Sequence, residues 1–386
     1  MATTLPTTLE QLVDRYDPTV FELTRSSARI RLAGGGPDPV DVVLDGDGAT
    51  LHPASDGRPD ALLTADEDTW AEIARDLRGG MDAFRSHRLK VRYDLHLGVG
   101  FLAATADGGE DGLRFSQVET REGAISISQG GSGPPVVMLH GLGATKVSFL
   151  PTLAALAGSY RAIAIDLPGF GDSVKPIRAA YDAPYFARVV VALLDALEID
   201  RAHLIGNSMG GRVALQVGLD HPDRVRRLAL LAPSLAWLRG RPWAPLLKLV
   251  APQLGLIQPA PRPVVEAIVR RVVPGADEEW TAAGIDEFLR SYLTPRGRAA
   301  FYAAARNIYL ESPNGRTGLW TRLPGLEAPS LFVWGKRDSL VPIGFADHVR
   351  RALPESKHLV LPGGHVPQLE NPKRTHEALL KFLARG

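Results

Sequence analysis

The chain of 386 residues contains no cysteine. This absence excludes a disulfide framework, a zinc–thiolate site and a cysteine nucleophile. It agrees with the reducing environment of the cytoplasm, which is the location we expect. The first twenty residues point the same way, because they contain Glu10, Asp14 and Asp17 and lack the basic start and apolar stretch of a signal peptide.

A long apolar run is absent as well. The most apolar segment, residues 242–261, is interrupted by Lys248 and several prolines, so we expect no transmembrane helix. The basic residues are scattered and no aromatic–basic module is visible, which argues against nucleic-acid binding. No histidine–carboxylate cluster has the spacing of metal ligands, so neither a metal nor an organic cofactor is expected.

Neither sign of charge dominates the whole chain, whose net charge is +1, but charge is unevenly divided. Residues 1–112 carry −9 and the remainder carries +10. A chain of this length exceeds what one hydrophobic core usually supports. We therefore predict two domains, residues 1–112 and 113–386. The uneven charge indicates that they either have separate partners or dock on one another, and drift in surface charge without a function is the alternative.

The most informative segment present is Gly206-Asn207-Ser208-Met209-Gly210, directly after the apolar run 202–205. A serine between two glycines, after a predicted strand and before a helix-like run at 212–219, is typical of a nucleophile elbow. The sharp turn forces an unfavourable backbone conformation on the serine, and the small glycines keep the strand and the helix from colliding with it. This pattern predicts Ser208 as a nucleophile.

Two candidate partners follow in the chain order serine, aspartate, histidine. Asp338 follows the strand-like run 330–334, and His365 lies in a glycine-rich turn after the run 358–361. Both are expected on loops at the carboxyl ends of parallel strands, where such a sheet presents its chemistry. We predict that Ser208 attacks, His365 takes its proton and Asp338 orients the imidazole.

The strand-like run 136–139 leads directly into His140-Gly141-Leu142-Gly143. With a triad in this chain order, a loop at this place supplies one N–H group of the oxyanion hole, and the residue after the nucleophile supplies another. The predicted donors are the backbone N–H groups of Leu142 and Met209.

Residues from about 114 to 386 resemble the α/β-hydrolase superfamily. The resemblance rests on His140-Gly141, the loop 166–173, and the segments 206–211, 335–338 and 364–367. It implies a mostly parallel sheet flanked by helices, led by strands at 113–118 and 123–128, with a helical cap inserted after the sixth strand. A serine nucleophile separates the chain from relatives such as epoxide hydrolases and haloalkane dehalogenases, which use an aspartate there.

The cap is expected at about residues 235–325, with helix-like runs at 245–250, 264–273 and 297–309. Its aromatic residues are candidates to line an apolar substrate pocket over the nucleophile, although packing within the cap is the commoner role of such side chains. The pocket candidates are Gly141, Trp237, Trp243, Phe288, Tyr292, Phe301, Tyr302 and Tyr309.

The N-terminal part has its own pattern of a helix near residues 7–16, four strand-like runs and a last helix from residue 95. The strand-like runs are 28–32, 40–45, 49–52 and 61–64. Residues 64–70, 79–84 and 89–94 resemble the sterol-carrier-protein lipid-transfer domain, which implies a small α+β domain with a fatty-acyl or sterol ligand in an apolar tunnel. Tyr93 departs from that pattern, because a glycine is usual before Asp94. A structural or dimerising appendage is the alternative.

The leading functional hypothesis is a serine hydrolase that cleaves carboxylic esters of apolar acyl groups through an acyl-enzyme intermediate. The elbow also resembles that of meta-cleavage-product hydrolases, which break a carbon–carbon bond, but Val366 stands where those enzymes usually have an aromatic residue. Acyl transfer to an alcohol or thiol is a third possibility. A lipid-binding carrier with a vestigial hydrolase is the alternative from another class, and an intact triad argues against it.

Overall fold

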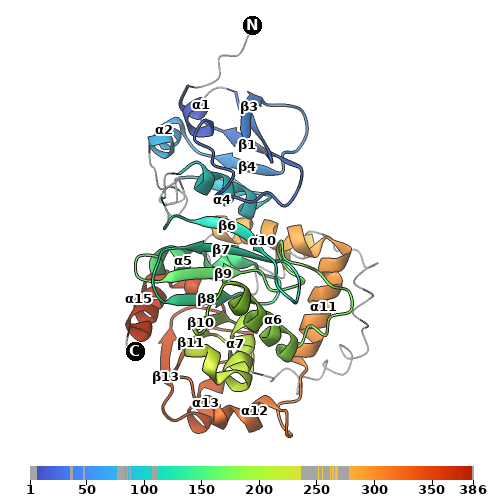
Figure 1. Ribbon diagram of the computed structural model, residues 1–386, viewed down its shortest axis with the longest axis vertical. Coiled ribbons are helices and arrows are strands. Elements are labelled where there is room, and N and C mark those ends of the chain that lie inside the picture. The colour runs from blue at the N-terminus through green and yellow to red at the C-terminus, as the bar shows by residue number, and fades with distance from the viewer. Residues whose placement is uncertain are drawn as a thin grey trace. The chain divides into compact units, whose positions relative to one another are not determined.

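The computed structural model describes residues 7–34, 38–46, 48–75, 83, 86, 88–106, 109, 111–235, 251, 254, 261, 263–264, 266–267 and 278–384. Its contacts divide the chain into two compact units (Figure 1). The small unit comprises Met1–Ser116, Ser128–Gly131 and Asp277–Arg290. The large unit comprises Gln117–Ile127, Ser132–Ala276 and Ser291–Gly386.

The small unit is built on a five-stranded sheet of order β3-β2-β1-β4-β5. Only β1 and β4 pair in parallel, and the other neighbours are antiparallel. Along β1 the buried residues Ala28, Ile30 and Leu32 alternate with more exposed ones, as expected of a strand with one covered face. The strands are β1 (Ser27–Ala33), β2 (Val40–Asp45), β3 (Ala49–Pro53), β4 (Ala61–Thr64) and β5 (Lys90–Arg92), and the first two helices are α1 (Thr7–Val13) and α2 (Glu67–Arg75).

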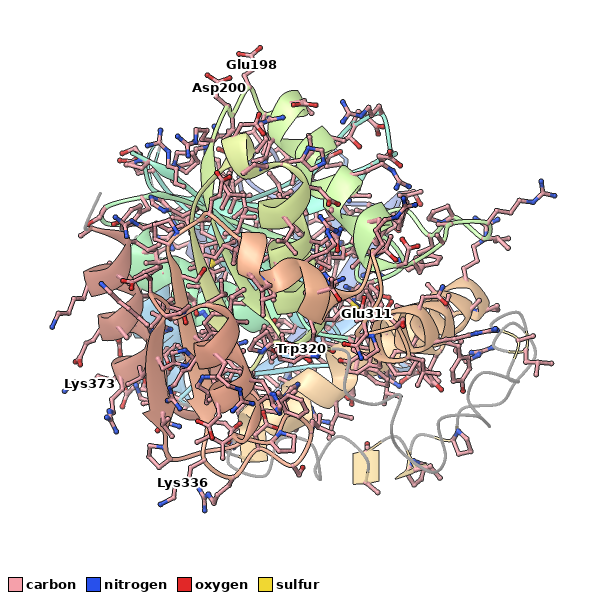
Figure 2. All side chains as sticks on the ribbon, turned by 90° about the horizontal axis from the view of Figure 1, so that it is seen from below. Glu198, Asp200, Glu311, Trp320, Lys336 and Lys373 are labelled. Carbon is pink, nitrogen blue, oxygen red and sulfur yellow. The ribbon has the colours of Figure 1, made fainter. Side chains whose placement is uncertain are left out.

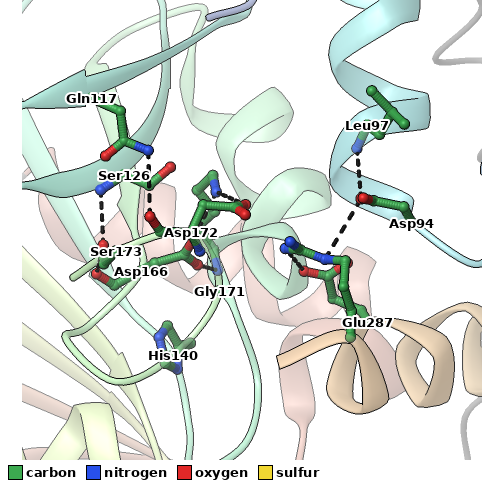
Figure 3. A network of polar contacts seen from close by, with 12 residues as sticks. Asp94, Leu97, Gln117, Ser126, His140, Asp166, Gly171, Asp172, Ser173 and Glu287 are labelled. Atoms are coloured by element: carbon green, nitrogen blue, oxygen red, sulfur yellow. Dashed lines mark hydrogen bonds and ion pairs between the residues drawn. The ribbon is translucent and has the colours of Figure 1, made fainter. Parts of the chain in front are cut away.

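Helix α4 (Leu95–Ala104) is apolar on all sides and almost entirely buried in the small unit. Asp94 caps its first turn by accepting a hydrogen bond from Leu97 N at 2.9 Å (Figure 3). A Cβ on Gly98 would lie 2.5 Å from Val91 Cγ1, and one on Gly100 would lie 2.2 Å from the Phe21 ring. The glycines therefore let α4 pack closely on β5 and on the Phe21 ring.

Tyr93, which directly follows β5, adopts a φ of 74°. A tyrosine in this left-handed region is strained, because its Cβ disfavours the conformation that glycine adopts readily. The guanidinium carbon of Arg58 lies 4.0 Å above the centre of the Tyr93 ring. This cation–π contact holds the strained residue in place.

Helix α10 (Glu278–Tyr292) lies within the range expected for the cap, yet its residues up to Arg290 belong to the small unit. The buried carboxylate of Asp286 accepts hydrogen bonds from Arg92 Nε at 2.7 Å and from Tyr93 N at 3.0 Å. Arg290 Nε lies 3.6 Å from an oxygen of Asp94. These contacts join α10 to the end of β5 and the start of α4.

The large sheet has eight strands in the order β13-β12-β11-β10-β8-β9-β7-β6, and the strands from β13 to β9 pair in parallel. Strands β10 and β12 are buried at every residue, as expected of central strands covered on both faces. The strands are β6 (Arg114–Val118), β7 (Ile125–Gly130), β8 (Pro135–Leu139), β9 (Arg161–Ile165), β10 (Ala202–Asn207), β11 (Val225–Leu231), β12 (Ser330–Gly335) and β13 (Lys357–Leu361).

The helices of the large unit follow the strands along the chain (Figure 1). Helices α6 and α7 contact one another, and apolar residues of both join the main core cluster with those of the central strands. The helices described in the large unit are α5 (Leu150–Leu156), α6 (Ala183–Ala196), α7 (Met209–Asp220), α11 (Pro295–Tyr309), α12 (Leu319–Arg322), α13 (Phe345–Ala352), α14 (Pro367–Glu370) and α15 (Pro372–Leu383). Its 3₁₀ turns are η1 (Lys146–Phe149), η2 (Pro222–Arg224) and η5 (Leu323–Gly325). Within the described part of the chain, no helix has the length and apolarity needed to cross a membrane.

Candidate active site

Ser208 stands at the joint between β10 and α7 with φ 52° and ψ −112°. This conformation is unfavourable for any residue with a Cβ. The turn is also too tight for side chains on either side of it. A Cβ on Gly206 would lie 2.3 Å from Gly210 O, and a Cβ on Gly210 would lie 2.0 Å from Leu139 O. Strand β10 can thus turn directly into α7 and leave the serine hydroxyl at the turn.

The structure brings Ser208, His365 and Asp338 together in one hydrogen-bonded row. The distance from Ser208 Oγ to His365 Nε2 is 2.7 Å, and that from His365 Nδ1 to Asp338 Oδ2 is 2.8 Å. All three residues are buried. Asp338 follows β12 and His365 follows β13, so both reach the elbow from the carboxyl ends of parallel strands.

The other oxygen of Asp338 fixes the carboxylate in place. Asp338 Oδ1 accepts hydrogen bonds from the backbone N–H groups of Leu340 and Val341, each at 2.8 Å. With Oδ2 accepting from His365 Nδ1–H, the Nε2 atom is left as an acceptor, so the Ser208 hydroxyl donates to it. This is the arrangement in which a histidine can take the proton of a serine.

Two side chains that the sequence did not indicate position the loop that carries His365. Asn207 Nδ2 donates to His365 O at 3.1 Å and to Leu231 O at 3.0 Å. Glu370 accepts from Gly364 N at 2.6 Å and from Val366 N at 2.9 Å. No motif marks these two roles, because each depends on which backbone groups the fold brings near.

Tyr309, the last residue of α11, places its hydroxyl 3.1 Å from Ser208 Oγ. The sequence indicated Tyr309 only as an aromatic candidate for an apolar pocket, so its polar contact was missed. Burial, with a smaller contribution from the negative charge of Asp338, raises the pKa of Tyr309 to about 12. The phenol is therefore a neutral hydrogen-bond donor at physiological pH.

His140 and Gly141 lie beside the elbow. Leu167 N donates to His140 Nε2 at 3.0 Å, so Nδ1 carries the ring proton and donates to Gly141 O at 2.8 Å. Burial lowers the pKa of His140, which keeps the ring neutral. A Cβ on Gly141 would lie 3.4 Å from Ser208 Cβ. The peptide between Gly141 and Leu142 is thus held close to Ser208.

A buried charge network ties the loop after β8 to the loop after β9 (Figure 3). Lys146 Nζ lies 2.6 Å from Asp166 Oδ2 and 3.5 Å from Asp172 Oδ2, and Lys146 N donates to Asp166 Oδ1 at 2.7 Å. Burial favours a raised pKa for Asp166, but the Lys146 ammonium outweighs it and the pKa is lowered. This ion pair fixes the chain four residues beyond Leu142.

Apart from Tyr309, the aromatic pocket candidates fall into three groups. The hydroxyls of Tyr292 and Tyr302 lie 2.9 Å apart, and the centre of the Phe301 ring lies 5.2 Å from that of the Tyr292 ring. Phe288 belongs to α10 in the small unit. Trp237 and Trp243 lie outside the described residues. Among the described side chains, no three histidines and carboxylates gather as a metal site would require.

Comparison with known proteins agrees with the geometry. A family model described as the alpha/beta hydrolase fold matches residues 134–372. The chain belongs to the α/β-hydrolase family. The matched residues cover most of the large unit, including its parallel strands β8 to β13 and the turn at Ser208.

Relatives of this α/β hydrolase act in different reactions. A pimeloyl-[acyl-carrier protein] methyl ester esterase from Aeromonas hydrophila is 30% identical over 67% of this chain and 99% of its own length. The dihydrolipoyllysine-residue acetyltransferase component of an acetoin cleaving system from Pseudomonas putida is 33% identical over 66% of this chain and 65% of its own length, so the match spans less than two thirds of that relative.

Two further relatives extend this range. A 2-hydroxy-6-oxononadienedioate/2-hydroxy-6-oxononatrienedioate hydrolase from a Pseudomonas species is 26% identical over 68% of this chain and 93% of its own length. The crystal structure of a membrane phospholipase A matches this structure with a TM-score of 0.60 and a sequence identity of 29%. The match covers 70% of this chain and 86% of the phospholipase chain. The family is therefore shared by esterases and other hydrolases, and membership alone does not specify the reaction.

Proposed function

We propose that this α/β hydrolase cleaves carboxylic esters of apolar acyl groups through an acyl-enzyme intermediate. The observation that carries the proposal is the row of hydrogen bonds from Ser208 through His365 to Asp338. The esterase and the phospholipase among the relatives support esters as the substrate class.

In the proposed mechanism Ser208 Oγ attacks the acyl carbon while its proton passes to His365 Nε2. Asp338 stabilises the imidazolium that forms. The tetrahedral intermediate collapses, the leaving alkoxide takes the proton from His365, and the alcohol departs. Water then attacks the acyl-enzyme with His365 again as the base, which releases the acid and restores the serine.

We assign the backbone N–H groups of Met209 and Leu142 to the developing oxyanion. Met209 is the first residue of α7, where N–H groups have no acceptor within the helix and the helix dipole favours negative charge. The N–H group of Leu142 and the carbonyl of Gly141 belong to the same peptide group and point to opposite sides of it. His140 donates a hydrogen bond to that carbonyl and so holds the peptide in its orientation. Preorganised donors of this kind lower the barrier without reorganising during the reaction.

The Ser208→Ala variant tests the proposal. We expect it to keep its fold and to lose hydrolysis of p-nitrophenyl esters by at least about 10⁴-fold, because the nucleophile is gone. A panel of esters that differ in acyl length would identify the preferred chain. Ester hydrolysis retained by Ser208→Ala would refute the assignment.

Carbon–carbon bond hydrolysis remains a second candidate because of the resemblance of the elbow and the relative that acts on 2-hydroxy-6-oxo dienedioates. Labelling of Ser208 by a fluorophosphonate probe distinguishes both enzyme candidates from a vestigial hydrolase, because the probe reacts only with an activated serine. A labelled protein without activity on any ester would favour the carbon–carbon candidate or acyl transfer.

For the small unit we propose a fatty-acyl or sterol ligand, on the strength of its resemblance to sterol-carrier domains. Helix α4 lies directly against Val91 at Gly98 and against Phe21 at Gly100, so a ligand would not lie at these two places. Titration of the full-length protein with a fluorescent fatty acid should give saturable binding, and a linear, non-saturating signal would contradict it.

A cytoplasmic location also stays a prediction, which cell fractionation can test.

A further inference from the structure

The hydroxyl of Tyr309 is a polar group at the reacting centre that the triad mechanism does not use. Its distance of 3.1 Å to Ser208 Oγ leaves open which of the two oxygens donates. The single proton of Ser208 is committed to His365 Nε2 at 2.7 Å. Tyr309 must therefore donate its proton, and Ser208 Oγ accepts through a lone pair.

Tyr309 keeps this proton during turnover. Burial is the main reason that its pKa lies at about 12, and the nearby Asp338 carboxylate acts in the same direction. Ionisation is therefore negligible at neutral pH. The phenol can offer a hydrogen bond to any oxygen near Ser208, but it does not serve as a base.

The end of α11 is held so that this hydroxyl keeps its place. Two residues after Tyr309, Glu311 accepts hydrogen bonds from Arg212 Nε at 2.6 Å and Arg212 Nη2 at 2.8 Å (Figure 2 labels Glu311). Arg212 is buried and lies four residues beyond Ser208 in α7. Two residues before Tyr309, Asn307 Nδ2 donates to Ala180 O. The helix that bears the nucleophile thus also positions the tyrosine.

We propose that Tyr309 is a catalytic residue, a side-chain donor to the oxyanion in addition to the N–H groups of Met209 and Leu142. This inference rests on the proposed acyl chemistry. When Oγ bonds to the acyl carbon, the π electrons of the carbonyl move to its oxygen and the serine proton moves to His365. The carbonyl oxygen, now bound to the same carbon as Oγ and carrying the negative charge, becomes the stronger acceptor within reach of the Tyr309 hydroxyl.

The Tyr309→Phe variant removes only the hydroxyl. Tyr309 donates to a neutral oxygen in the free enzyme and to a charged one in the transition state, so only the difference between the two hydrogen bonds is lost. We expect kcat to fall about tenfold, which corresponds to about 1.4 kcal/mol, with KM changed by less than about twofold. An aryl trifluoromethyl ketone accepts the Ser208 oxygen at its carbonyl carbon and forms an adduct that carries an oxyanion. The affinity for this inhibitor should fall by the same factor.

Tyr160→Phe is the matched control, because Tyr160 precedes the amino end of β9, at the edge of the sheet opposite the site. It removes a hydroxyl from the same unit and should leave kcat and inhibitor affinity unchanged. A purely structural role for Tyr309 would lower the melting temperature without a parallel loss of inhibitor affinity. If Tyr309→Phe does not fold, the Glu311→Gln variant gives a second measurement. It loosens the end of α11, so it should reduce kcat and the inhibitor affinity together.

Unchanged kcat and unchanged inhibitor affinity in Tyr309→Phe would overturn the inference. Failure of the proposed function is distinguishable, because fluorophosphonate labelling of Ser208 needs no ester substrate. If the protein hydrolyses no ester but is labelled, slower labelling of Tyr309→Phe than of Tyr160→Phe supports the donor. Equal labelling rates refute it.

Discussion

Ser208 shows at the scale of one residue how backbone strain and chemistry are combined. Its φ of 52° is imposed by the strand-to-helix turn, and its hydroxyl is held from two sides by His365 and Tyr309. Strain of this kind costs about 1–3 kcal/mol and persists only where the surrounding structure fixes it. The rest of the fold therefore compensates for a conformation that places the Ser208 hydroxyl beside His365.

This strain predicts a difference between two inactive variants. Ser208→Gly should be more stable than Ser208→Ala by about 1 kcal/mol, because glycine adopts a positive φ without a Cβ clash. Chemical denaturation of both proteins would measure the difference. The control is Ala214→Gly inside α7, which should lose about 1 kcal/mol because no strain is relieved there. Equal stability of the two Ser208 variants would mean that the turn is not strained.

The sequence predicted three residues that the structure joins in one hydrogen-bonded row. Ser208, Asp338 and His365 each sit in a short glycine-containing segment after an apolar run, so chain order and local motif were enough to select them as candidates, and their catalytic roles stay a prediction. Tyr309 and Asn207 could not be found in this way. Their roles depend on side-chain hydrogen bonds to groups 101 and 158 positions away, which only tertiary packing creates.

At the scale of elements, the apolar runs located the strands well. The runs at 28–32 and 40–45 correspond to β1 and β2, and those at 330–334 and 358–361 correspond to β12 and β13. Buried strands of a parallel sheet are nearly continuous apolar segments, and this makes them visible in sequence. The predicted helix at 297–309 is α11, whereas the predicted helices at 245–250 and 264–273 fall largely or wholly outside the described residues.

The sequence of α10 alone does not show to which of the two units this helix belongs. Its amphipathic pattern shows that one face is covered but not which part of the chain covers it. The answer depends on Asp286 meeting Arg92, a partner 194 positions earlier. A pairing between distant charged residues has no local signature, so α10 was assigned to the cap by its position alone.

At the scale of the whole molecule, several histidines are held neutral by burial. Burial lowers the pKa of His203 and of His358 to about 4, with neighbouring arginines adding to the effect, and it also lowers the pKa of His140. In the unfolded chain a histidine titrates near 6.5. The unfolded state therefore binds more protons than the folded state as the pH falls below that value.

We expect stability to be highest above about pH 6.5 and to fall as the pH drops from 6.5 towards 4. His203, which is buried, should account for up to about 3 kcal/mol of this loss. Melting temperatures measured between pH 4.5 and 7.5 would test this. His203→Phe, which can keep the edge contact with the Tyr160 ring, should show a shallower decline. An identical pH dependence in both proteins would exclude His203 as a cause.

The assignment of residues 277–290 to the small unit affects how the protein is made. Residues 1–131 are translated before the segment Ser132–Ala276, and helix α10 of the same unit is translated only after that segment. At about 5–20 residues per second, synthesis of the intervening segment takes roughly 7–30 s. During this interval Asp286 has not yet been made, so Arg92 lacks the hydrogen bond that joins it to α10 in the folded chain.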